Sequence, residues 1–261
     1  MQQQMRAAGE ATTVAAPNSK LAPTMVTALL ACGVAATVGY IAMDVAATLR
    51  YGGYSYVSQT ISELSAVGAP TRPMWLAGSI IYELLVIAFG SAVVLVAGNR
   101  RGLRIAGALL VVMALVGIAW PFAPMHQREV LAAGGGTLTD TMHLVLAGVD
   151  VVLTMLIIGF GAGAFGARFR VYSFVTIAAT LVFGAWTGID APRVSDNATT
   201  PGIGIAERIT VYGFMTWFAV LAIVLILEAG RTHAATTSVA GIAPGRTTGR
   251  TQMRRAKWHG Y

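Results

Sequence analysis

Six long apolar blocks dominate the sequence and constrain its fold more than any other feature. They cover residues 23–44, 74–98, 103–120, 141–165, 171–189 and 210–227. Each is close to the roughly 20 residues that a helix needs to cross the hydrocarbon core of a bilayer. Because lipid offers an open backbone no hydrogen-bond partner, we expect helices, and the alternating pattern of a membrane barrel is missing from the sequence. The predicted fold is all-α, an integral membrane bundle of six transmembrane helices.

The composition indicates a membrane protein and bears on whether it has a disulfide, a metal or a cofactor. Of the 261 residues, 56% are hydrophobic and only 11% are charged, whereas an ordinary soluble domain is about 25% charged. The single cysteine, Cys32, excludes an intrachain disulfide. The sequence lacks the Cys and His spacings typical of zinc sites. We therefore predict neither a metal nor a cofactor.

The basic residues predict the topology. Most of the 18 Lys and Arg residues lie in the segments 6–20, 99–104, 167–170 and 231–257. All four segments fall on one side of a six-span topology, and most acidic residues fall on the other side or within the spans. Since basic residues collect on the cytoplasmic side, both termini are predicted inside (N-in/C-in), in the plasma membrane. The net charge of +7 is then a topology signal, so we predict no nucleic-acid partner.

Three segments are predicted from these patterns. Residues 1–21 form a polar cytoplasmic tail, residues 22–230 the six-helix transmembrane domain, and residues 231–261 a basic, disordered cytoplasmic tail. The basic tail is expected to touch anionic lipid headgroups. The sequence predicts no particular oligomeric state.

Two carboxyl groups lie deep in the predicted spans. Glu83 is about 13 Å into the second block at 1.5 Å per residue, and Asp150 reaches a similar depth in the fourth. A charge at the bilayer centre costs at least about 2.5 kcal/mol, so such residues usually face the bundle interior or a water-filled cavity. We predict that both bind a ligand or relay protons. The alternative is a protonated acid that bonds a neighbouring helix.

The fourth block also carries a histidine on the same helix face as Asp150. Helical spacing places Asp140, His143 and Asp150 on one side of the helix. His143 is a candidate base, proton carrier or metal ligand, and the alternative is that Asp140 caps the helix while His143 lies at the interface. His126, which follows two prolines in the preceding loop, is a candidate ligand-binding residue or an exposed loop histidine.

The first loop also carries candidate site residues. Thr60 and Glu63 have capping-box spacing, which predicts a short helix at the membrane interface. A sharper interpretation places Ser58, Ser62 and Glu63 in an outward pocket beside a histidine, where a serine could attack an acyl group. The sequence has no Gly-x-Ser-x-Gly elbow to support that chemistry.

The segment from Ser58 to Leu64, with its sequence Ser-Gln-Thr-Ile-Ser-Glu-Leu after a first span, is similar to the domain-of-unknown-function 998 family of prokaryotic multipass membrane proteins. The later Pro-Met-His stretch at 124–126 is compatible with that family. The resemblance covers residues 22–230 and implies a six-helix membrane domain. It marks Ser58, Ser62 and Glu63 as positions of interest and implies no reaction.

Three functions remain open from the sequence. The leading hypothesis is an outward-facing polar pocket that binds or carries a small molecule or a lipid, with membrane lipid as the expected partner. A second hypothesis is an intramembrane hydrolase or transferase that acts on lipid at the outer leaflet, with His143, Asp140 and Glu63 as catalytic residues. A third is a non-catalytic scaffold or assembly factor, in which the acids only bond helices.

Overall fold

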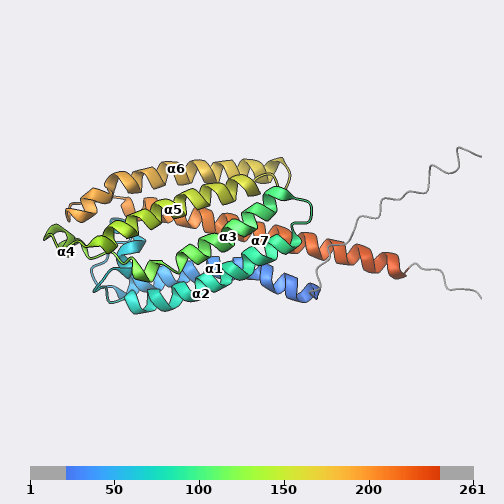
Figure 1. The fold of residues 1–261 in the computed structure, drawn as a ribbon, viewed down its shortest axis with the longest axis horizontal. Helices are drawn as coiled ribbons and strands as arrows, with labels where there is room; N and C mark the ends of the chain where they lie inside the picture. The colour runs from blue at the N-terminus through green and yellow to red at the C-terminus, as the bar shows by residue number, and fades with distance from the viewer. Residues whose placement is uncertain (1–21, 242–261) are drawn as a thin grey trace, which may run out of the picture.

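The computed structural model describes residues 22–241, which fold into six long helices and three short ones (Figure 1). The long helices are α1 (Pro23–Arg50), α2 (Arg72–Val96), α3 (Arg101–Gly117), α5 (Leu138–Gly161), α6 (Ala167–Ser195) and α7 (Ile203–Gly241). The short ones are η1 (Ile61–Ser65), η2 (Trp120–Phe122) and α4 (Arg128–Ala132). Within this described part, six helical segments are long and apolar enough to cross a membrane, the third of them including η2. The all-α prediction is confirmed.

Three of the predicted spans are too short at the same end of the bundle, and one of them is α6, which continues past Ile189 to Ser195. α1 continues past Asp44 to Arg50, and α7 begins at Ile203 instead of near residue 210. The predicted spans place the charged residues Asp44 and Arg208 at or beyond the helix ends. In the structure they neutralise each other inside the bundle, so the helices can extend through them.

The two predicted tails have different outcomes. Residues 1–21 lie outside the described part of the chain. α7 continues to Gly241, so the first part of the segment 231–261, which was predicted to be disordered, is helical. Residues 242–261 lie outside the described part as well.

The helices form a closed ring in which chain neighbours pack together. α1 packs on α2 and α7, α3 packs on α2 and α5, and α6 packs on α5 and α7. Figure 1 shows α1 starting and α7 ending at the same end of the bundle. The opposite end, which we call the capped end, carries the connecting segments 51–71, 118–137 and 196–202. That the capped end faces outside stays a prediction from the basic residues.

The core lies along α7 and its neighbours. Trp217, Phe218 and Leu221 of α7 are fully buried, and Phe89 of α2 packs on Phe218 with ring centroids 5.8 Å apart. α2 and α3 approach closely because glycines face each other. A Cβ atom added at Gly107 would lie only 2.9 Å from the backbone oxygen of Gly90, the close packing that small residues allow between membrane helices.

Candidate functional site

Arg208 joins α7 to α1 and to the first loop. Its guanidinium forms a bidentate pair with Asp44, with Nε–Oδ2 and Nη2–Oδ1 both 2.8 Å, and the Arg208 residue is only 2% exposed. Its other N–H groups donate to the Tyr54 hydroxyl and to the backbone oxygens of Tyr56, Gln59 and Gly204. A guanidinium has five N–H donors, and all five are used here. Arg208 therefore has no N–H left for an anionic ligand.

Tyr54 is held in the same network. Its hydroxyl donates to the backbone oxygen of Thr60 at 2.7 Å and accepts from Arg208 at 2.9 Å. Burial raises the pKa of the Tyr54 hydroxyl well above its ordinary value, because the phenolate would be poorly solvated there. Tyr54 therefore keeps its proton and serves as a hydrogen-bond donor to the loop.

Arg128 makes a similar set of hydrogen bonds, which joins the connecting segments of the capped end. It pairs with Glu63 through Nε–Oε1 at 2.5 Å and Nη2–Oε2 at 2.9 Å. Its remaining N–H groups donate to the backbone oxygens of Ser58 and Ala198 and to the Thr200 hydroxyl. Arg128 thereby ties three segments of the capped end together, and all five of its donors are also used.

Glu63 has several structural partners. It accepts from the Thr60 backbone N–H at 2.7 Å while Thr60 caps η1, so the predicted capping box and short helix are confirmed. Gln59 Nε2 donates to the same carboxylate at 3.2 Å. Ser62 Oγ donates to Glu207 of α7 at 3.0 Å, and the Ile61 backbone N–H donates to Glu207 too. Through these bonds, Glu63 and Ser62 hold the first loop against the bundle.

The two histidines take different partners from those expected. Asp140 is the third residue after Thr137 in the capping box at the start of α5, and it accepts from His126 through the backbone N–H at 2.7 Å and Nδ1 at 2.9 Å. His143 instead donates from Nδ1 to the backbone oxygen of Ala123 at 3.0 Å. Glu63 bonds Arg128, so the structure does not join His143, Asp140 and Glu63 in one hydrogen-bonded set. Their catalytic role stays a prediction.

The deep acids, by contrast, come together. The Trp120 ring packs edge-on against His143 at 4.7 Å between centroids, and its Nε1 donates to Asp150 Oδ2 at 3.2 Å. His143 and Asp150 thus share one face of α5, as the helical spacing predicts. Glu83 of α2 interacts electrostatically with Asp150. Its carboxyl fills the space over Gly117, where an added Cβ would collide with it.

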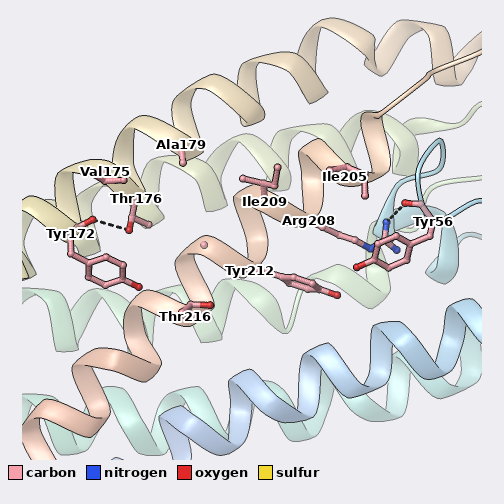
Figure 2. A pocket seen from close by; sticks show the side chains of 11 residues that line it. Tyr56, Tyr172, Val175, Thr176, Ala179, Ile205, Arg208, Ile209, Tyr212 and Thr216 are labelled. Atoms are coloured by element: carbon pink, nitrogen blue, oxygen red, sulfur yellow. Dashed lines mark hydrogen bonds between the residues drawn. The ribbon is translucent and has the colours of Figure 1, made fainter.

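A groove runs between α6 and α7, starting at the capped end (Figure 2). Its volume is about 470 Å³, and its lining is mostly apolar. The lining residues are Tyr172, Val175, Thr176 and Ala179 of α6, Ile205, Arg208, Ile209, Tyr212, Gly213 and Thr216 of α7, and Tyr56 of the first loop. Val175 is 61% exposed, so the groove opens on the outside of the bundle, where lipid would lie.

One end of this groove is polar. The Tyr56 ring lies over the Arg208 guanidinium, with Cζ 3.7 Å from the ring centroid, and Tyr212 donates to Asp44. In Figure 2, Tyr56, Arg208 and Tyr212 gather at this end and Tyr172 lies at the other. None of these residues was predicted from the sequence to belong to a site. The available signal was Arg208, a charge at the edge of an apolar block.

The ligand-binding residues predicted from the sequence lie elsewhere. Glu83, Asp150, Ser58, Ser62 and His126 are all outside the lining of the α6–α7 groove. Ser58 and Ser62 belong to the bonded first loop, His126 pairs with Asp140, and only the two deep acids interact with each other. In residues 22–241, no three His, Cys, Asp or Glu side chains gather as a metal site would require.

The six membrane-length helices define a multipass membrane protein. A family described as a protein of unknown function (DUF998) matches residues 19–224, and the chain belongs to that family. The family resemblance noted in the sequence is confirmed. No curated protein and no solved structure matched the chain.

Proposed function

We propose that this protein binds a lipid or a lipid-like small molecule in the groove between α6 and α7. One observation carries the proposal: an apolar groove of about 470 Å³, open toward the bilayer, ends at a cluster of polar side chains. Ligand sites in proteins commonly measure about 300–1,000 Å³ and combine apolar walls with a few polar groups. A ligand with an apolar chain and one polar end matches this arrangement.

The polar end favours an uncharged headgroup. Arg208 is neutralised by Asp44 and has no spare N–H, so the groove offers an anion little attraction. Tyr56, Tyr212 and Thr216 line the groove, and each carries a hydroxyl, a group that can both donate and accept hydrogen bonds. The Tyr212 proton is already donated to Asp44, so Tyr212 can offer a ligand only an acceptor. An alcohol on a long apolar chain is therefore the ligand class that fits. With the predicted N-in/C-in topology, its head would lie in the outer leaflet of the plasma membrane.

A photoactivatable fatty alcohol tests this proposal. The full chain is reconstituted in phosphatidylcholine vesicles, irradiated with the probe, and digested for mass spectrometry. We expect labelled peptides from α6 and α7. Competition by the unlabelled alcohol should remove the label, while its methyl ether, which cannot donate a hydrogen bond, should compete several-fold less well.

Two variants sharpen the test. Gly213→Leu should fill the groove and lower the labelling several-fold, since an added Cβ there has only Thr176 nearby, at 3.9 Å. Ala108→Leu is the matched control, because Ala108 lines a separate groove between α2 and α3. Equal labelling of all six helices, unchanged by Gly213→Leu, would contradict the proposal.

The scaffold hypothesis is the second candidate, and one observation favours it. The charged groups at or near the capped end are bonded within the fold: Arg128 pairs with Glu63, Arg208 pairs with Asp44, and Glu207 accepts a hydrogen bond from Ser62. A protein in which these groups serve only the fold would show the non-selective labelling just described.

A further inference from the structure

The pair formed by Glu83 and Asp150 is used neither by the groove nor by the capped end. Glu83 lies in the middle of α2 and Asp150 in the middle of α5. α3 separates these helices in the ring; Gly117 at the end of α3 contacts Glu83, and Trp120 of the following η2 helix contacts Asp150. The pair therefore sits at a three-helix junction in the membrane-spanning part of the bundle.

No cation balances the pair within residues 22–241. The ion pairs there join Arg100 to Glu228, His126 to Asp140, Arg128 to Glu63, and Arg208 to Asp44. The groups around the pair are Tyr82 on α2, Trp120 of η2, and His143, which packs against the Trp120 ring. Tyr40 of α1 packs on Tyr82 at 5.3 Å. None of these groups carries a fixed positive charge.

The hydrogen bonds around the pair are incomplete. Asp150 Oδ2 accepts from Trp120, but Asp150 Oδ1 is buried and has no hydrogen-bond partner. Glu83 lies against the bare backbone of Gly117. A buried carboxylate oxygen without a donor is costly, and two neighbouring carboxylates in a medium of low dielectric repel each other strongly. A bound proton removes a charge and supplies a donor, so it relieves both costs.

We propose that Glu83 and Asp150 together form an intramembrane proton-binding site that retains at least one proton at neutral pH. The two carboxyls act as one coupled unit, so a single proton serves the pair. The site shares no residue with the α6–α7 groove, and its occupancy by a proton does not depend on any ligand there. Membrane-embedded acids commonly mark such proton sites.

Dicyclohexylcarbodiimide tests the proposal directly, because this apolar reagent reacts with protonated carboxyls inside membranes. The acid adds across one C=N bond, its proton passes to nitrogen, and acyl migration leaves a stable N-acylurea with no leaving group. The full chain in vesicles is treated at a series of pH values, and the modified peptides are identified by mass spectrometry. We expect modification at Glu83 or Asp150 that falls as the pH rises.

Glu63 is the internal control, since it is also buried but forms an ion pair with Arg128, and we expect it to be unmodified. Glu83→Gln and Asp150→Asn each remove the repelling partner, so the remaining acid should be modified only at lower pH than in the native chain. A purely structural hydrogen bond would not produce this shift. The proposal is overturned if neither acid reacts at any pH, if Glu63 reacts equally, or if removing one acid leaves the pH profile of the other unchanged.

Discussion

Arg208 of α7 and Asp44 of α1 are joined by two hydrogen bonds of 2.8 Å, and both residues are almost completely buried. They are 164 residues apart in the sequence. The pair closes the ring of helices between its first and last members, and it holds the polar end of the α6–α7 groove in place. Its geometry is that of a structural ion pair with every donor satisfied.

Breaking this pair should destabilise the bundle strongly. Arg208→Ala leaves Asp44 as an uncompensated buried charge, and removing one partner of such a pair typically costs about 3–5 kcal/mol. Arg208→Lys should not restore the loss, because an ammonium cannot make the bidentate contact. Unfolding in mixed detergent, followed by circular dichroism, measures the difference. If Asp44→Ala combined with Arg208→Ala costs as much as the sum of the single changes, the two residues are not coupled.

Arg128 should control the order of the capped end. Arg128→Gln removes the contacts to Glu63, Ser58, Ala198 and Thr200, so segments 51–71 and 196–202 lose their common anchor. Hydrogen exchange should become faster in both segments and remain slow in the core of α7. Arg193→Gln, at an exposed arginine of α6, is the matched control. Faster exchange in one segment alone would show that Arg128 does not link them.

Gly117 should be required for the position of Glu83. An added Cβ would occupy the place of the Glu83 carboxyl, and overpacking of this kind costs about 1–3 kcal/mol. Gly117→Ala should therefore destabilise the native chain, but much less so in a Glu83→Ala background, where the space is free. Thermal unfolding of the four chains measures this coupling. Equal losses in both backgrounds would mean that the carboxyl and the glycine do not compete for space.

Tyr54 should make stability sensitive to alkaline pH. Its pKa is raised on folding because the hydroxyl is buried, so the native state favours the neutral form. The stabilisation is complete below the ordinary tyrosine pKa of about 10 and is lost as the pH rises above it. Tyr54→Phe should be less stable at neutral pH but should lose less stability between neutral and alkaline pH. Parallel slopes of unfolding free energy against pH in the two chains would contradict this.

Local pattern was enough to predict much of the architecture. The six spans follow from hydropathy and the short η1 helix from the spacing of Thr60 and Glu63, since both features involve residues close together in the chain. The common face of His143 and Asp150 follows from helical periodicity. Helix geometry is repetitive, so such relations can be read without knowing the tertiary structure.

Other features were decided only when distant segments met. Three ion pairs are examples. Asp140 pairs with His126 and not with His143, Glu63 pairs with Arg128, and Asp44 pairs with Arg208. Each pairing depends on how the loops and helices pack. The pairing also explains why α1 and α7 extend beyond their predicted limits, because a neutralised charge can remain inside a membrane helix. The α6–α7 groove has the same origin, since it exists only where two helix faces and one loop come together.

The sequence by itself determined which residues are apolar, charged or periodic along one helix. The tertiary structure decided which charges neutralise each other and where a cavity remains, because those depend on contacts between residues far apart in the chain.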